Sequence, residues 1–231
     1  MWRTFVICFF GLCYVCCALA SDFGARYLGT RYVASPLGES VLPDDDPLIR
    51  FDAFDCVTFV ETVLADGNVA QLNKIRYANG MPSFTNRNHF IETDWLRNNA
   101  HLVRDVTAQY GKVKSRAVTI DKKNWFKKNY NIDTKFAPET VQLKYIPYEN
   151  ISDIRPHAPV IVLFITDSDN IRNKIGTDLA VRHTGILLPT GVLRHASQTA
   201  GRVVDVIFTK YVKQMMENKN NLGIMVLEIK K

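Results

Sequence analysis

One cysteine in this chain is placed to act as a nucleophile. Outside the first twenty residues Cys56 is the only cysteine, and it follows Asp55 in the run Phe51-Asp-Ala-Phe-Asp-Cys-Val-Thr-Phe-Val-Glu-Thr-Val-Leu64. Asp is a favoured N-cap and apolar residues recur after it at helical spacing, so the pattern predicts a helix over about 55–66. A thiol in the first turn of a helix lies near unpaired backbone N–H groups and the positive end of the helix dipole, which stabilise a thiolate.

Two histidines could serve this thiol. His183 and His195 lie in two short apolar runs joined by a turn with Pro189 and Gly191. Such a pattern predicts neighbouring strands that carry both imidazoles. Amide hydrolysis by a thiol needs a base, a group that orients the base and an oxyanion donor. We therefore expect Cys56, His183 and His195 to form a catalytic centre.

The order of the predicted elements indicates an α+β fold. Helices expected over 55–66 and 69–78 come first, and strands dominate the second half. Val160–Thr166 is the clearest buried strand, because it is an unbroken apolar run. We expect helices that carry the cysteine to pack on an antiparallel sheet that carries the histidines. Further strands are predicted over 102–107, 117–120, 141–147, 202–207 and 222–229, and further helices over 121–129 and 209–217.

The first residues have the pattern of an export signal. Arg3 precedes an apolar stretch that ends in Ala18-Leu-Ala20, the small-x-small pattern of a cleavage site. The stretch is about 15 residues long, short of the roughly 20 that span a bilayer. We expect a signal peptide over residues 1–20, and no membrane association once it is removed. Four of the five cysteines lie in this segment, so the mature chain cannot form an internal disulfide.

The composition and charge of the chain are those of a globular domain and exclude several other classes of protein. A hydrophobic content of 47% and a charged content of 23% are typical of a globular domain and argue against disorder or a coiled coil. The formal charge of +6 suits an anionic polymer, yet the basic residues are scattered, so nucleic-acid binding is not expected. We expect residues 21–231 to form one monomeric domain that needs no metal or other cofactor.

Three phrases of the chain resemble the NlpC/P60 superfamily of cell-wall cysteine peptidases. Asp55-Cys-Val-Thr-Phe-Val60, His183-Thr-Gly-Ile-Leu-Leu188 and Leu193-Arg-His-Ala-Ser197 are similar to its Asp-Cys-Ser-Gly-Leu-Val, His-Val-Gly-Ile-Tyr and Ile-His-Ala-Ser. The chain departs from it at Val57-Thr-Phe59 and in a long stretch before His183, which we assign to an enlarged insertion between about 68 and 155. Both departures, and the phrase Arg87-Asn-His-Phe-Ile-Glu-Thr-Asp-Trp95, resemble the DUF1460 or N-acetylmuramoyl-L-alanine amidase-like family.

This resemblance implies a papain-like α+β fold in which Cys56, His183 and His195 hydrolyse an amide bond of peptidoglycan or muropeptides. The favoured bond joins MurNAc to L-Ala, and the implied location is the periplasm or cell envelope of a bacterium. Tyr32 matches a tyrosine that helps to hold the oxyanion, with the backbone N–H of Cys56 as a second donor. The segment 83–99 is expected to form a wall of the substrate cleft. The remaining substrate-binding candidates are Asp55, Asn86, Arg87, His89 and Asp94.

Other interpretations stay open. The same three residues could cut the D-Glu to diaminopimelate bond or pass an acyl group to an amine, and the fold could also be an inactive wall-binding module. A zinc amidase would use His89, His183 and His195 as ligands, but the spacing of these residues is not that of common metal sites. His89 could instead pack a loop, and Arg87 and Asp94 could pair with each other. Trp95 is expected in the core.

Overall fold

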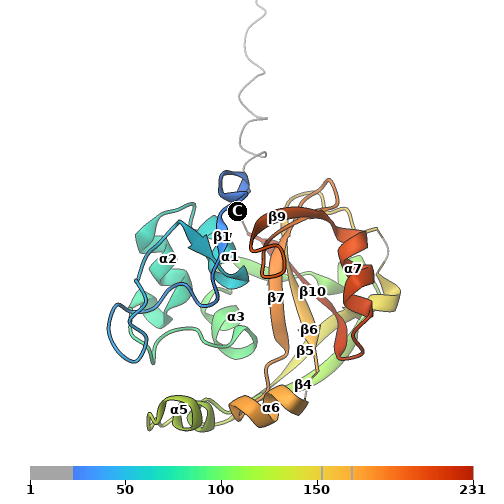
Figure 1. Cartoon of the computed structure of the whole chain (residues 1–231). Coiled ribbons are helices and arrows are strands. Elements are labelled where there is room, and N and C mark those ends of the chain that lie inside the picture. Colours follow the sequence, from blue (N-terminus) through green and yellow to red (C-terminus); the bar gives the residue numbers. More distant parts are fainter. Residues whose placement is uncertain (1–22, 152, 168, 231) are drawn as a thin grey trace, which may run out of the picture.

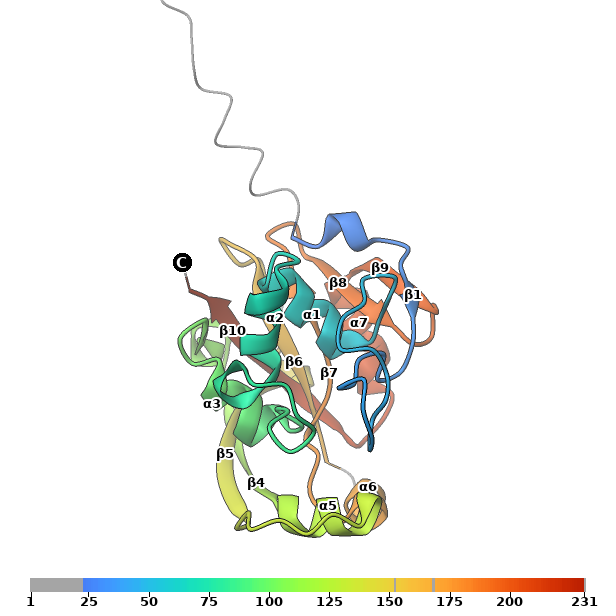
Figure 2. The same cartoon turned by 90° about the vertical axis from the view of Figure 1, so that its left-hand side faces the viewer.

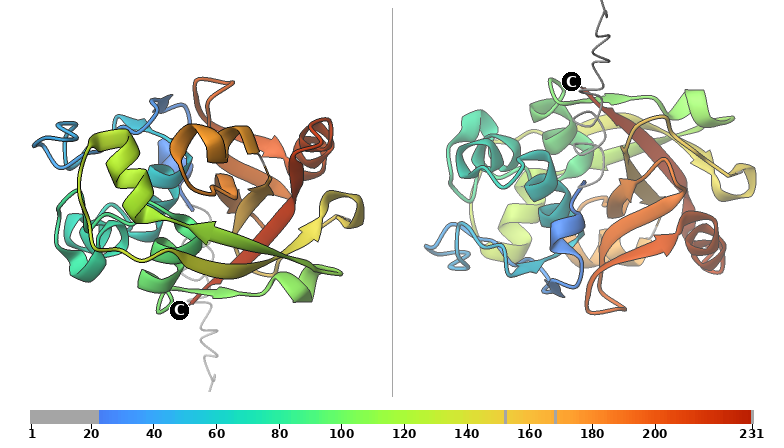
Figure 3. Two further views of the ribbon diagram at one scale, coloured as in Figure 1. Left: turned by 90° about the horizontal axis from the view of Figure 1, so that it is seen from below. Right: turned by 90° about the horizontal axis from the view of Figure 1, so that it is seen from above.

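The structure is a computed structural model that describes residues 23–151, 153–167 and 169–230. The expected signal peptide, residues 1–20, lies outside the described residues. Helices α1 to α3 lie on one side of a long twisted sheet and α7 lies on the other, while α5 and α6 lie together at one end (Figure 1). Figure 2 shows α1 and α2 in front of the sheet, and the two views of Figure 3 show the same layers along the perpendicular direction.

The elements have the following bounds. The helices are α1 (Cys56–Leu64), α2 (Val69–Arg76), α3 (Leu96–Asn98), α4 (Thr107–Tyr110), α5 (Lys122–Tyr130), α6 (Asp169–Ile175) and α7 (Phe208–Met216), with a π-helical turn over Ile91–Trp95 before α3. The strands are β1 (Arg31–Tyr32), β2 (Ala53–Phe54), β3 (Val103–Asp105), β4 (Lys114–Ile120), β5 (Glu139–Pro147), β6 (Val160–Thr166), β7 (Val181–Leu187), β8 (Val192–Ser197), β9 (Arg202–Ile207) and β10 (Asn221–Ile229).

The strands of the described residues form one sheet in the order β2-β1-β9-β8-β7-β6-β10-β5-β4, and β3 also pairs with β10. Every neighbouring pair is antiparallel except β1 and β2, which are parallel. The last strand in the chain, β10, lies inside the sheet between β6 and β5. The C-terminal strand is therefore part of the centre of the fold.

Strand β6 is buried on both faces, which explains why its sequence is an unbroken apolar run. Its side chains alternate between two cores: Ile161, Leu163 and Ile165 pack with the α1 layer, whereas Val162 and Phe164 pack with α7. All of them are buried. A strand covered on both faces has no position for a polar side chain, so period-2 alternation of polarity is lost.

The predicted order of elements is confirmed, with helices first and a mainly antiparallel sheet after them. The expected helices and strands are all present, with ends that differ by at most three residues. Helix α6 was missed because none of its residues is buried, so it carries no apolar stripe. In the described part of the chain, no helix is both long enough and apolar enough to cross a membrane.

Candidate active site

Cys56 is the first residue of α1. Asp55 caps the helix as expected: its carboxylate accepts a hydrogen bond from the backbone N–H of Thr58 at 2.8 Å, and the Thr58 hydroxyl accepts one from the Asp55 N–H at 3.0 Å. This capping box fixes the direction in which the chain enters the helix. The carboxylate of Asp55 thus helps to hold Cys56 in place at the start of α1.

The sulfur of Cys56 lies where two strands separate. Strands β7 and β8 pair only through Ile186 with Arg194 and Leu187 with Leu193, and α1 packs against both strands. Before Ile186, the backbone of Thr184 makes a hydrogen bond to the Cys56 thiol group instead, and this bond favours the thiolate. Burial, and after it the charge of Asp55, outweigh this bond and raise the pKa of Cys56 to about 12. The residue that holds the sulfur therefore directly follows His183.

The two histidines form a hydrogen-bonded pair on the predicted hairpin. His183 Nε2 and His195 Nδ1 are 2.7 Å apart. Gly185 makes this approach possible, because a Cβ there would lie 2.9 Å from the Cβ of His195 and from a methyl group of Leu193. Burial lowers the pKa of His183 to about 3 and that of His195 to about 4. Both imidazoles are therefore neutral at pH 7.

Aromatic rings hold this pair from the α7 side. The ring of Tyr211, on α7, lies 5.0 Å from that of His195 and 6.0 Å from that of His183, measured between centroids. Phe164 of β6 packs against both His183 and Tyr211, at 5.4 Å and 5.2 Å. Burial, and then the charge of Cys56, raise the pKa of Tyr211 to about 12. No sequence pattern indicated a role for Tyr211, because this residue lies outside the motifs around Cys56, His183 and His195.

Tyr32 also lies near the sulfur. It pairs with Phe54 across the short parallel strands β1 and β2, and Phe54 directly precedes Asp55. Burial first, then the charges of Cys56 and Asp55, raise the pKa of Tyr32. A phenol that stays protonated near Cys56 could donate a hydrogen bond to an oxyanion that forms there.

A buried glutamate anchors the strand that carries His183. Glu92, in the π-helical turn, accepts hydrogen bonds from the backbone N–H groups of Ala180 and Val181, both at 2.7 Å. It is 4% exposed, and burial raises its pKa. Sequence analysis quoted this residue within a motif without giving it a role. Its position in the apolar frame Phe90-Ile-Glu-Thr-Asp-Trp95 was the available signal, because a buried carboxylate needs partners.

Two cavities flank the centre. The α1-side cavity, about 320 Å³, is lined by residues that include Asp44, Asp55, Glu61, Arg76 and Arg87. The histidine-side cavity, about 440 Å³, lies between the ends of β7 and β8, the turn after β8, and α7. His183, His195 and Tyr211 line it, together with Arg182, Ser197, Gln198, Thr199 and Gln214 among others. Of the segment 83–99, Arg87, Asn88 and His89 line the α1-side cavity, and the role of this segment as a wall of the substrate cleft stays a prediction.

The charged candidates in this segment form ion pairs within the protein. Arg87 binds Glu39 at 2.8 Å and Asp44 at 2.8 Å, whereas Asp94 binds Lys122 at 3.1 Å. The alternative in which Arg87 and Asp94 pair with each other is therefore wrong. Both side chains instead reach partners that are distant in the sequence.

The other two polar candidates of the segment 83–99 also make local contacts. His89 Nε2 donates a hydrogen bond to the carbonyl of Phe84 at 2.6 Å, and its ring packs on Trp125 and Phe126. Burial lowers the pKa of His89 to about 3. The side-chain amide of Asn86 donates to the carbonyl of Met81 at 3.4 Å. Both side chains stabilise the wall of the α1-side cavity, and only His89 also lines it.

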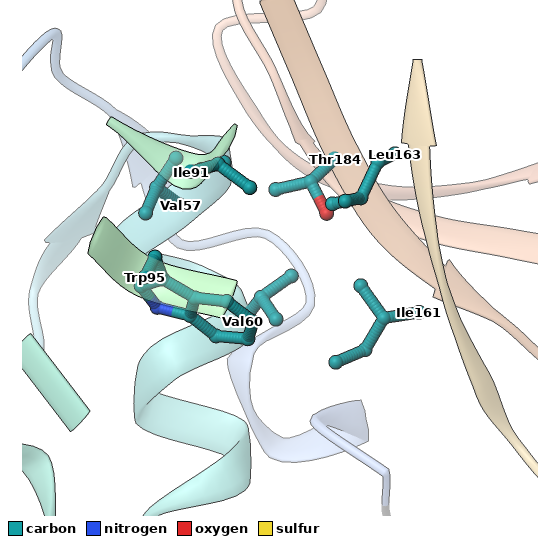
Figure 4. Close-up of a pocket in the computed structure, with 7 residues that line it drawn as sticks. All are labelled: Val57, Val60, Ile91, Trp95, Ile161, Leu163 and Thr184. Carbon is teal, nitrogen blue, oxygen red and sulfur yellow. The ribbon is translucent and has the colours of Figure 1, made fainter. Parts of the chain in front are cut away.

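A small apolar void lies between α1, the π-helical turn and strands β6 and β7. Val57, Val60, Ile91, Trp95, Ile161, Leu163 and Thr184 line it (Figure 4). Trp95 is 3% exposed, which confirms its expected place in the core, and its indole N–H donates to Glu61 at 3.0 Å. At about 10 Å³ the void holds no substrate. Among the described residues, no three His, Cys, Asp or Glu side chains are grouped to hold a metal ion.

Fold and sequence together define an amidase-like protein. A model of the AmiA-like family, described as N-acetylmuramoyl-L-alanine amidase-like, matches residues 22–220. The chain belongs to this family, and the resemblance to it found in the sequence is confirmed.

Solved structures agree with this family. A Legionella pneumophila protein of the DUF1460 family is 25% identical over 92% of this chain and 88% of its own, with a TM-score of 0.82. An N-acetylmuramoyl-L-alanine amidase from Bacteroides uniformis is 25% identical over 90% of this chain and 96% of its own, with a TM-score of 0.70. No curated protein matches the chain.

Proposed function

We propose that this protein is an exported hydrolase that cleaves an amide bond of peptidoglycan with Cys56 as the nucleophile, at the bond between MurNAc and L-Ala. The observation that supports the proposal is the backbone hydrogen bond from Thr184 to the Cys56 sulfur, because Thr184 directly follows His183 in β7 and His183 is paired with His195. Family membership supports the peptidoglycan substrate, and the Bacteroides uniformis relative is named for the MurNAc–L-Ala bond. We also propose that the fold is the papain-like fold of the NlpC/P60 superfamily, because the sequence phrases around Cys56, His183 and His195 resemble its motifs.

The pKa values indicate how the thiol is activated. Without substrate, the Cys56 thiol and the His183 imidazole are both neutral at pH 7, because burial disfavours either charge alone. His183 Nε2 is engaged with His195, which leaves Nδ1 as the base. Nδ1 takes the thiol proton while the sulfur bonds to the substrate carbonyl carbon, and the carbonyl oxygen becomes an oxyanion. The Cys56 N–H and the Tyr32 hydroxyl donate to that oxyanion.

The remaining steps return the enzyme to its starting state. His183 gives its proton to the amide nitrogen, the carbon–nitrogen bond breaks, and the amine half leaves a thioester on Cys56. Water then loses a proton to His183 and attacks the thioester. The carbon–sulfur bond breaks, the acid half leaves, and the proton returns to the sulfur. His195 keeps the base oriented throughout, as a second polar group does in related catalytic triads.

Digestion of purified sacculi tests the proposal. We expect the wild-type protein to release peptides with free L-alanine amino groups, identified by mass spectrometry, and the Cys56→Ala variant to release none. Glycan strands that keep L-Ala and D-Glu would assign the cut to the D-Glu to diaminopimelate bond instead. Equal digestion by the parent and by a correctly folded Cys56→Ala variant would refute nucleophilic catalysis by Cys56.

A further inference from the structure

The histidine pair leaves one nitrogen without a partner. His195 Nδ1 is bonded to His183, but His195 Nε2 is buried and has no hydrogen-bond partner in the described part of the chain. An unpartnered buried polar atom destabilises the fold, because it has lost its hydrogen bonds to water without gaining others. His195 is 2% exposed and lines the histidine-side cavity. An acceptor for this nitrogen would therefore come from a molecule bound in that cavity.

The position of one proton decides whether the pair can work. Two neutral imidazoles joined by a hydrogen bond share a single proton between His183 Nε2 and His195 Nδ1. If His183 donates, its Nδ1 is bare and can take the thiol proton, and His195 carries its own second proton on Nε2. If His195 donates, His183 Nδ1 is protonated and cannot act as a base. The working form is thus the one in which His195 Nε2 is an unsatisfied donor.

The histidine-side cavity is suited to an anionic, acceptor-rich chain. Arg182 projects there from a bulge in β7: the register to β6 skips one residue between His183 and Val181. Bulges redirect side chains next to functional sites. Gln198, Gln214, Ser197 and Thr199 add amide and hydroxyl groups, and no Asp or Glu lines the cavity in the described residues. The α1-side cavity contrasts with it, since Asp44, Asp55 and Glu61 line its wall.

We propose that the histidine-side cavity binds the peptide half of the substrate, and that a carbonyl or carboxylate oxygen of this peptide accepts a hydrogen bond from His195 Nε2. This inference rests on the proposed function. The contact stabilises only the tautomer in which Nε2 is protonated, so the bound peptide itself sets His183 Nδ1 as the base. Arg182 pairs with a carboxylate of the stem peptide.

The proposed mechanism also requires the peptide half of the substrate to lie on the side of the histidines. His183 gives its proton to the leaving nitrogen, so that nitrogen lies within hydrogen-bond reach of the His183 ring. The amine half, which is the peptide, then extends on the side of the histidines. The acyl half, which carries the sugar, extends toward α1. Free L-Ala-γ-D-Glu is therefore a product analogue that can be tested without turnover.

Nitrogen NMR on the Cys56→Ala variant tests the proposal, because this variant binds without cleaving. We expect saturation with L-Ala-γ-D-Glu to give His195 Nε2 the shift of a protonated nitrogen and His183 Nδ1 that of a bare one. N-acetylmuramic acid serves as the ligand control and should leave both shifts unchanged. Peptide binding that leaves the tautomers unchanged, or no peptide binding, would overturn the proposal.

Charge variants locate the peptide. Arg182→Met should weaken binding of L-Ala-γ-D-Glu about tenfold in calorimetry with the same Cys56→Ala background. Arg202→Met is the matched control, since Arg202 is an exposed arginine on β9 that does not line the cavity, and it should change binding less than twofold. Equal effects of the two variants would contradict the assignment. Sacculus digestion that continues at the MurNAc–L-Ala bond would leave the proposed function intact even if the peptide site failed.

Discussion

The two cavities beside Cys56 are built in different ways. The α1-side cavity is held by charged side chains from segments far apart in the sequence, such as Arg87 with Glu39 and Asp44. The histidine-side cavity is held by strand pairing and aromatic packing around His183, with Phe164 and Tyr211. A charge network loses stability when a single partner is removed, whereas strand pairing is disturbed by added bulk. The two sides of one centre therefore fail under different changes.

The largest effect is expected on the histidine side. His183→Ala removes the base, and general acid–base catalysis contributes about 10²–10⁴-fold to rate, so kcat/KM on muropeptides should fall by that factor. Circular dichroism should show an unchanged fold. His101→Ala is the control, because His101 is exposed and its ring makes a hydrogen bond with the carbonyl of Asn98, away from Cys56 and the histidine pair. A loss of less than tenfold in His183→Ala would exclude His183 as the base.

On the α1 side, Arg87→Met should destabilise the fold. It leaves Glu39, whose side chain is 3% exposed, as a buried charge without its cation, and breaking such a pair costs about 3–5 kcal/mol. Denaturant unfolding measures this loss. Arg97→Met is the control, because the pair of Arg97 with Glu139 is exposed and worth less than about 1 kcal/mol. Similar losses in both variants would show that the two sides do not differ as described.

Lowering the pH should reduce the unfolding free energy through His89 on the α1 side and, separately, through His183 and His195 on the histidine side. The pKa of His89 is about 3 in the folded protein and about 6.5 when unfolded. A lowered folded pKa gives stability that is complete above pH 6.5 and lost as pH falls, by about 1.4 kcal/mol per unit. His89→Gln should thus reduce the loss of unfolding free energy between pH 6.5 and 4.5 by about 2 kcal/mol. The loss due to His183 and His195 remains in this variant, and identical acid profiles would contradict the lowered pKa of His89.

The smallest effect tests the close approach of the strands. Gly185→Ala places a methyl group against His195 and Leu193, and overpacking of this kind costs about 1–3 kcal/mol. We expect a lower thermal midpoint together with reduced kcat, because the His183–His195 hydrogen bond is displaced. Thr190→Ala should change neither quantity appreciably, because Thr190 is an exposed residue in the turn of the same hairpin and does not line the histidine-side cavity. A fully active Gly185→Ala protein would show that the pair tolerates a wider separation.

Local signals explain how much could be predicted from the sequence. Helix α1 and its Asp55 cap, and the hairpin of His183 and His195, depend on residues close together in the chain, and both were predicted. The partners of Arg87 and Asp94 were not, because Glu39, Asp44 and Lys122 are distant in sequence and no spacing rule identifies them. The bulge that exposes Arg182 and the contact of Tyr211 with both rings are products of tertiary packing, so they also needed the structure.

The place of β10 has a consequence for folding. This strand, Asn221–Ile229, inserts between β6 and β5, although both of these strands come well before it in the sequence. Pairing between strands that are distant in the sequence is slow, because a long loop must close first. Until β10 is in place, β6 lacks one of its two neighbours, and β6 is the strand that pairs with β7, which carries His183. We therefore expect the geometry around His183 to form only after β10 has paired, so a chain truncated before Asn221 should lack that geometry.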